Sequence, residues 1–246
     1  MKQFAILLLA GLTLLSCGPN RIQQQRIAEA TVELGEAHLN QGNFTAALKV
    51  LLDAEKVIPN DPFLHNDLGV AYMGKERFDL AELHFKKAVA LKSDYIPARN
   101  NLGTAYLKQK KYDKALACYK KFSTDLLYST PHFAFSNMGW AYLGKKNHAL
   151  AQKYFSKALN LNPDFINAVH GLATSQIQSG DARKAEALIE KTLKRQPRAS
   201  VLHADLARIY EARNQPSQAK AAWKRVLLFA PETSPLALEA ESKLNN

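Results

Sequence analysis

The chain has 246 residues, of which 47% are hydrophobic, and a formal net charge of +11 at pH 7. Much of the positive charge lies in lysine runs such as residues 108–121, which we interpret as solvated helix faces that at most steer association with anionic lipid or an acidic partner. The sequence has no Gly-x-Ser-x-Gly or His-Glu-x-x-His motif and no paired carboxylates, and its seven histidines lack the i,i+4 spacing of a metal site on one helix. We therefore predict a non-enzymatic protein with no metal ion and no small-molecule substrate.

The first sixteen residues have the pattern of a secretory signal peptide. Lys2 precedes an apolar run over residues 4–15, which is too short to span a bilayer. Residues 14–17, Leu-Leu-Ser-Cys, resemble the bacterial lipobox, in which the cysteine receives a diacylglyceryl group and becomes the mature N-terminus. The resemblance implies that Cys17 is lipidated, with no cofactor besides this covalent lipid, and that it tethers the protein to a membrane. An ordinary secreted protein cut near Ser16 is the alternative.

The residue that follows Cys17 indicates to which membrane the lipoprotein is sorted. Gly18 stands where the inner-membrane retention signal of many lipoproteins has Asp, so the resemblance implies an outer-membrane lipoprotein that faces the periplasm. Behind an export signal we expect no nucleic-acid partner. Lipidation of Cys17 would leave Cys118 alone, so no intramolecular disulfide is available. We expect residues 17–27 to form a short tether that reaches roughly 35 Å when extended.

From residue 28 onward, small residues return every thirty-four residues, with one step of thirty-six. One register consists of Ala47, Ala81, Ala115, Ala151, Ala185 and Ala219. A second register lies twelve residues ahead of the first and consists of Gly35, Gly69, Gly103, Gly139, Ala173 and Ala207. A period of this length indicates a stack of helical hairpins.

The repeat can be written in a thirty-four-residue frame that starts at Ala28, with Leu or Met at position 7, Gly or Ala at 8, Ala at 20 and a bulky residue at 24. We expect the small residues at positions 8 and 20 to face each other where two antiparallel helices cross, because larger side chains there would cost about 1–3 kcal/mol. This pattern resembles the tetratricopeptide repeat (TPR). The resemblance implies an all-α fold, a right-handed superhelical solenoid of six TPR hairpins over residues 28–61, 62–95, 96–129, 132–165, 166–199 and 200–233. Residues 234–246 are predicted to form a C-terminal capping helix.

The step of thirty-six residues falls at the junction between the third and fourth repeats. Phe122 replaces the expected Ala at position 27, and Tyr128 and Pro131 lie in the lengthened connection. We expect these residues to change the angle between the two hairpins. We also expect an aromatic-lined joint, to which the neighbouring rings would contribute, namely Phe133, Phe135 and Trp140.

The first helices of TPR hairpins line a concave groove, mainly through positions 2, 5, 9 and 12. An apolar floor dotted with amide groups, which these positions carry here, suits a bound peptide segment or an amphipathic helix. The predicted groove residues are Phe63, Asn66, Val70, Met73, Asn100, Thr104, Leu107, Phe133, Trp140 and Leu143. For any single aromatic residue among them, packing within the solenoid is an equal alternative.

The lipobox, the six repeats and the joint together resemble the type IV pilus lipoproteins of the PilF/PilW/Tgl (pilotin) family. In that family Asp-x-x-Tyr-Pro-like segments lie between the third and fourth repeats, and residues 125–143 look similar, although the proline here stands three residues after Tyr128. The resemblance implies a pilotin, which binds the secretin subunit and promotes its insertion and ring assembly in the outer membrane. The main alternative is a lipoprotein adaptor that gathers cell-wall hydrolases or a protease, and a chaperone scaffold is a more distant one.

Overall fold

The computed structural model describes residues 20–123 and 129–245. Within these residues all regular secondary structure is helical, and twelve helices pair into six antiparallel hairpins that are followed by one further helix. The helices are α1 (Arg21–Asn40), α2 (Phe44–Glu55), α3 (Pro62–Gly74), α4 (Phe78–Leu91), α5 (Ile96–Lys108), α6 (Tyr112–Lys120), α7 (Pro131–Gly144), α8 (His148–Leu161), α9 (Ile166–Gln178), α10 (Ala182–Leu193), α11 (Ser200–Ala212), α12 (Pro216–Phe229) and α13 (Pro235–Asn245).

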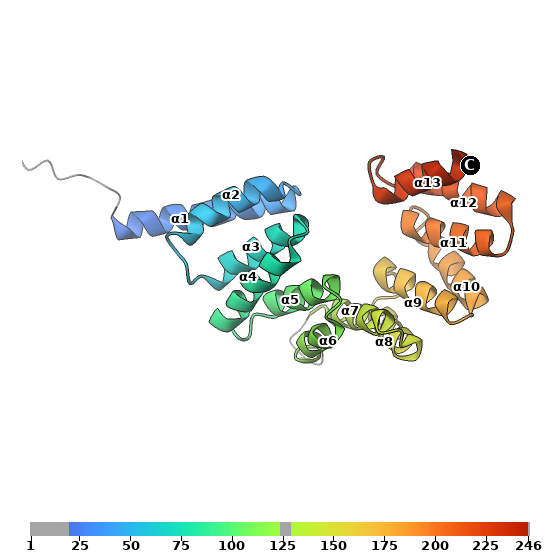
Figure 1. The fold of residues 1–246 in the computed structure, drawn as a ribbon, viewed down its shortest axis with the longest axis horizontal. Helices are drawn as coiled ribbons and strands as arrows, with labels where there is room; N and C mark the ends of the chain where they lie inside the picture. The colour runs from blue at the N-terminus through green and yellow to red at the C-terminus, as the bar shows by residue number, and fades with distance from the viewer. Residues whose placement is uncertain (1–19, 124–128, 246) are drawn as a thin grey trace, which may run out of the picture.

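The hairpins stack into an arch, with the first hairpin at one end and α13 at the other (Figure 1). The odd-numbered helices lie on the inner side of the arch, and each of them contacts the next odd-numbered helix. Because a hairpin can bury its apolar face only against its neighbours, the buried residues form four clusters along the stack. The predicted all-α TPR superhelix with a C-terminal capping helix is confirmed.

Packing in the core explains the small residues at position 8. It also corrects our expectation that they face the alanine at position 20. A Cβ atom added at Gly35, Gly69 or Gly103 would lie only 2.4–2.5 Å from the nearest atom, which belongs in each case to the bulky side chain at position 24 and not to the alanine at position 20. Glycine at these positions therefore makes room for Leu51, Phe85 and Tyr119, which are fully buried.

Position 4 of the frame carries a polar side chain with a structural role in three hairpins. His65 and His203 each place Nε2 within 2.9 Å of the carbonyl oxygen of the proline six residues earlier. Arg99 donates a hydrogen bond from Nη2 to the carbonyl oxygen of Ser93, which also lies six residues earlier in the chain. These side chains satisfy a carbonyl in the connection that leads into each hairpin, which helps to fix how successive hairpins stack.

The N-terminal helix begins earlier than the repeat frame predicts. Asn20 caps it, since its side-chain oxygen accepts a hydrogen bond of 2.8 Å from the backbone N–H of Gln23. Residues 21–27, which we assigned to the tether, are therefore helical, and a helix rises only about 1.5 Å per residue. The extended length of 35 Å is an overestimate. Cys17 and the signal peptide lie outside the described residues. None of the helices in the described part of the chain is long and apolar enough to cross a membrane.

At the third junction, Phe122 and Phe135 belong to the same cluster of packed residues. Phe122 is buried and makes an edge-to-face contact with Tyr119, and Phe135 also lies near Tyr154 of the fourth hairpin. An aromatic-lined joint that includes Tyr128 stays a prediction. Pro131 occupies the first turn of α7, where its missing N–H costs nothing. Tyr128 lies outside the described residues. Phe133 contacts Phe165 in the connection that leads to the fifth hairpin, and Trp140 contacts His170 on α9 of that hairpin.

Candidate protein-binding groove

A hollow of about 550 Å³ lies on the inner side of the arch and is lined mainly by α5, α7 and α9. Four of the predicted groove residues line it, namely Thr104, Leu107, Trp140 and Leu143. The other lining residues are Lys108, Tyr112, Asn137, Gly144, Asn167 and Gln178. The hollow thus combines apolar walls with three side-chain amides and one lysine.

Amide side chains link the inner helices to one another. Asn101 on α5 donates to Oδ1 of Asn66 on α3 at 3.0 Å, and Asn137 on α7 donates to Oδ1 of Asn100 on α5 at 3.4 Å. We call these four residues the amide ladder. An asparagine has two donor hydrogens and two acceptor lone pairs, so members of the ladder keep hydrogen-bonding capacity beyond these contacts. A bound segment can use that capacity to satisfy its own backbone groups.

Trp140 forms the wall of the hollow between α7 and α9. Its indole N–H donates to Oδ1 of Asn167, which also accepts a hydrogen bond from Ser136. The ring stands edge-on to Phe155 at a centroid distance of 5.3 Å and lies equally far from His170. Trp140 is therefore held in place by the solenoid while part of its ring borders the hollow, so its packing role is observed and its contact with a partner stays a prediction.

The remaining predicted groove residues lie elsewhere on the inner surface. Phe63 and Phe133 are exposed, and each stacks edge-to-face on the ring at position 34 of its own repeat, at centroid distances of 5.0 and 4.9 Å. Val70 and Met73 are half-buried against the core between the second and third hairpins. Asn66 is only 8% exposed and belongs to the packing between hairpins, so we correct its assignment as an accessible contact.

Several lining residues were not predicted. Asn137 is at position 6 and Gln178 and Lys108 are at position 13 of the frame, next to the positions that we considered. Tyr112 comes from the start of a second helix, α6. The groove is therefore wider than positions 2, 5, 9 and 12 of the first helices indicate. Residues beside these positions, and one residue of a second helix, also line it.

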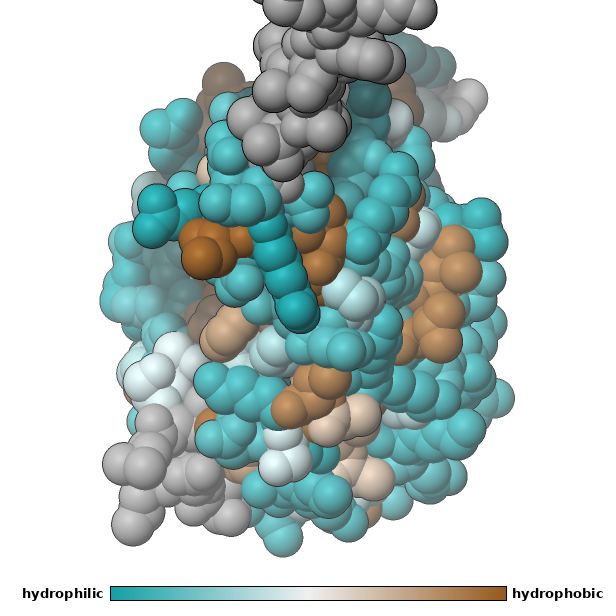
Figure 2. All heavy atoms as spheres, turned by 90° about the vertical axis from the view of Figure 1, so that its left-hand side faces the viewer, coloured by the Kyte–Doolittle hydropathy of each residue, from teal (hydrophilic) through white to brown (hydrophobic). Residues whose placement is uncertain are grey.

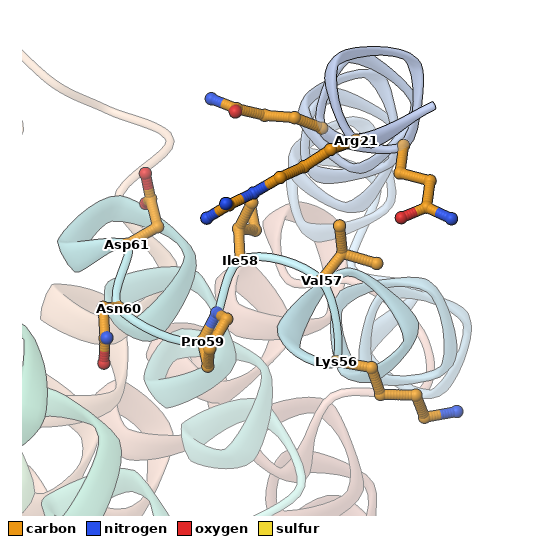
Figure 3. Close-up of a pocket in the computed structure, with 9 residues that line it drawn as sticks. Arg21, Lys56, Val57, Ile58, Pro59, Asn60 and Asp61 are labelled. Carbon is orange, nitrogen blue, oxygen red and sulfur yellow. The ribbon is translucent and has the colours of Figure 1, made fainter. Parts of the chain in front are cut away.

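A second, larger hollow of about 700 Å³ lies outside the groove, where the start of α1 overhangs the connection between α2 and α3. Arg21 extends across it toward the residues of that connection, which include Ile58, Pro59 and Asp61 (Figure 3). This hollow exists because α1 begins at Arg21.

The structure also brings together two histidines that the sequence separates. His65 on α3 and His84 on α4 lie with their Nδ1 atoms 3.1 Å apart, and Glu55 at the end of α2 lies beside them. We looked for metal ligands only at i,i+4 on one helix, which misses a pair that faces across an antiparallel hairpin. The buried Cys118 is different, since burial raises the pKa of its thiol and favours the unreactive protonated form.

Known proteins share both the repeat and the overall fold. The Tetratricopeptide repeat family matches residues 22–65, 32–96, 96–121, 142–204 and 177–244, which together cover most of the chain. The chain belongs to the tetratricopeptide-repeat family. The type IV pilus assembly protein PilF of Pseudomonas aeruginosa is 28% identical over 189 residues, which are 76% of this chain and 75% of PilF.

Solved structures extend the likeness to nearly the whole chain. The structure of Pseudomonas aeruginosa PilF has a TM-score of 0.67 at 22% identity and covers 89% of this TPR protein and 99% of PilF. The structure of PilW, a widely conserved type IV pilus biogenesis factor, has a TM-score of 0.74 at 20% identity, with 88% and 99% covered. At these identities the structures show a shared fold, and the sequence match to PilF supports the predicted family resemblance.

Proposed function

We propose that this TPR protein acts in type IV pilus biogenesis as a pilotin-like lipoprotein, which binds a segment of a secretin subunit and assists its assembly in the outer membrane. The observation that carries the proposal is the sequence similarity to PilF, which extends over three quarters of both chains. The hollow between α5, α7 and α9 supplies a binding surface of matching type, because TPR proteins bind other proteins through this face.

The chemistry of the hollow suits a peptide that is apolar on one side. Leu107 and Trp140 would contact the apolar side chains of such a segment. Asn167 accepts hydrogen bonds from Trp140 and Ser136 with its Oδ1, so its NH₂ group can donate to a backbone carbonyl of the segment. Asn137 and Asn100 of the amide ladder, which are only half-buried, extend this polar track from α7 to α5.

The lipid anchor is a separate part of the proposal. Cys17 would carry the lipid, and α1 begins at Arg21, so the solenoid would lie close to the membrane and concentrate its client there. We expect Cys17→Ser to release the protein from outer-membrane fractions without changing its helical content. Recovery of the variant in the outer membrane would contradict the anchor, and circular dichroism supplies the folding control.

The deciding experiment measures heat-stable secretin multimers in outer membranes from cells with and without this gene. The proposal predicts that multimers disappear while the secretin monomer remains. If multimers persist unchanged, the pilotin role is wrong, and an adaptor for cell-wall hydrolases or a protease becomes the better candidate.

Two groove variants then test where the client binds. Gln178→Arg places a long charged side chain at the exposed rim of the hollow, and Trp140→Ala removes one wall. Both should reduce the multimers while the protein stays folded. Leu83→Arg is the matched control, because Leu83 is exposed on α4 outside the hollow. Equal loss of multimers in Leu83→Arg would contradict a groove at α5, α7 and α9.

A further inference from the structure

Three potential metal ligands meet where the first two hairpins stack. Glu55 comes from the last turn of α2, His65 from α3 and His84 from α4, and one ligand atom of each lies within 4.8 Å of the others. His65 is fully buried and His84 nearly so, whereas the Glu55 side chain is 27% exposed. The site is therefore closed on the histidine side and open to solvent at the carboxylate.

The distances are close to those of a tetrahedral zinc site. Ligand nitrogens 2.0–2.1 Å from Zn²⁺ stand about 3.3–3.4 Å apart in a tetrahedron. The Nδ1 atoms of His65 and His84 are 3.1 Å apart, and the Nδ1 of His65 is 3.8 Å from Oε1 of Glu55. The two nitrogens need to separate by a few tenths of an ångström, and the Glu55 carboxylate, which lies within 4.8 Å of both histidines, has to move closer to His84, as its partly exposed side chain allows.

A hydrogen bond on the far side of the ring prepares His65 to act as a ligand. Its Nε2 lies 2.8 Å from the carbonyl oxygen of Pro59, which can only accept, so Nε2 carries the proton. The Nδ1 of neutral His65 then presents its lone pair toward His84. An N–H donated to a backbone carbonyl is the usual support of a zinc-bound histidine.

The same chain contains a comparison site that lacks the other two ligands. His203 makes the equivalent hydrogen bond to the carbonyl of Pro197 at the junction of the fifth and sixth hairpins. At the positions equivalent to Glu55 and His84, that junction has Leu193 and Ala222. The stacking of two hairpins therefore requires neither the second histidine nor the glutamate, and these residues add metal-binding groups to a place that is otherwise apolar.

We propose that Glu55, His65 and His84 bind a zinc ion that joins α2, α3 and α4 and so fastens the first hairpin to the second. A water molecule would take the fourth position on the open side. In the metal-free protein the proton shared by the two Nδ1 atoms belongs to His84. Zinc binding moves that proton to Nε2 of His84, so that both Nδ1 atoms are ligands.

The surroundings favour the neutral imidazole that a metal needs. Burial lowers the pKa of His84, which favours the neutral ring, and the ring of Tyr72 stacks on it at 5.3 Å. Lys87 opposes cation binding, since its Nζ lies 4.0 Å from Oε1 of Glu55. Lys87 is on the solvent side and can swing away, whereas the two histidines are fixed by packing.

The test is a zinc titration of the full processed chain in detergent, with a chromophoric chelator as competitor. We expect one zinc ion per chain and a thermal midpoint that rises with zinc concentration. Co²⁺ in the same site should give the visible absorption of tetrahedral coordination. Nitrogen NMR should show the proton of His84 move from Nδ1 to Nε2 on zinc addition.

Variants separate this site from other histidines. His84→Ala should abolish zinc binding and still fold, because alanine occupies the equivalent position in the sixth hairpin. Glu55→Gln should weaken zinc affinity by at least about tenfold. His203→Ala is the matched control and should bind one zinc ion as the wild type does. A folded wild type that retains no zinc, or a His84→Ala variant that binds zinc as tightly as the wild type, would overturn the proposal.

Discussion

Asp67 is a carboxylic acid buried in α3 beside the amide ladder. Desolvation, followed by repulsion from Glu36, raises the pKa of Asp67 to about 7. One of its oxygens accepts a hydrogen bond from Asn66 at 3.2 Å. Below neutral pH the folded protein therefore keeps this group protonated, whereas in the unfolded chain it ionises near pH 3.8.

This difference predicts a loss of stability as pH rises. Between pH 3.8 and about 7 the unfolded chain releases a proton that the folded protein retains, so the free energy of unfolding falls and then levels off above pH 7. Asp67→Asn copies the neutral form. It should stabilise the protein at pH 8, by up to about 3–4 kcal/mol, and have little effect near pH 4. Urea unfolding at both pH values measures this.

The exposed Asp94→Asn serves as the control for Asp67→Asn, because it removes one negative charge without removing a buried carboxyl group. A stabilisation of Asp67→Asn that is the same at pH 4 and pH 8 would show that ionisation is not the cause.

Repeat positions could predict which residues lie on the inner face, but not which of them bond to each other. Trp140 and Leu107 were placed in the groove from positions 9 and 12, and both border the hollow. Asn66 was placed there by the same argument, yet it pairs with Asn101 and is buried. The pairing depends on side chains in successive hairpins, which a period of thirty-four residues leaves unspecified. Whether Trp140 contacts a client stays a prediction.

The turns inside the hairpins share a residue with a positive φ angle. Position 15 of every repeat has a positive φ, between 56° and 89°, and only two of the six residues there are glycine. These two are Gly42 and Gly180, and the other four are Glu76, Lys110, Lys146 and Asn214. A side chain in the left-handed region costs roughly 1–2 kcal/mol, so four turns of the solenoid carry this strain.

Replacement of Lys110 by glycine should therefore stabilise the protein. Relief of the strain exceeds the extra chain entropy that glycine gives the unfolded state, so we expect a gain of roughly 0.5–1 kcal/mol. Lys114→Gly, the same substitution inside α6, should instead destabilise by about 1 kcal/mol. Urea unfolding distinguishes the two, and a destabilising Lys110→Gly would mean that the lysine side chain contributes more than the turn conformation costs.

The repeat predicts the helix pairs, but it does not predict where the first helix begins. The thirty-four-residue frame places the start of the first helix at Ala28, whereas α1 begins at Arg21. The signal was local, because Asn20 followed three residues later by Gln23 has the pattern of an N-terminal cap. A repeat frame reports what neighbouring hairpins have in common, so it omits an extension that only the first hairpin has. His65 and His84 were missed for a similar reason, since no other junction carries the second histidine.

The two ends of the solenoid differ in how their apolar residues are covered. Figure 2 views the end formed by the first hairpin, where apolar patches appear among hydrophilic surface. Ile27 and Leu34 on α1 are about half exposed there, at 54% and 49%. At the other end α13 covers the last hairpin. A solenoid needs a polar outer face on its terminal units, and among residues 20–123 and 129–245 only the last hairpin has an additional helix over it.

Removal of α13 should loosen the sixth hairpin and leave the rest of the arch folded. The helix buries Ala237 and Ala240 against α11 and α12, and Arg208 on α11 pairs with its Glu239 at 2.7 Å. Because each hairpin is stabilised mainly by its neighbours, a chain that ends at residue 233 should lose amide hydrogen-exchange protection in α11 and α12 but keep it in α3 to α7.

Ala240→Asp should reproduce this loss in the full chain by placing a charge in the interface, whereas Leu238→Asp, at an exposed position on the same helix, should not. Unchanged protection of α12 in the shortened chain would mean that the sixth hairpin is stable without its cover.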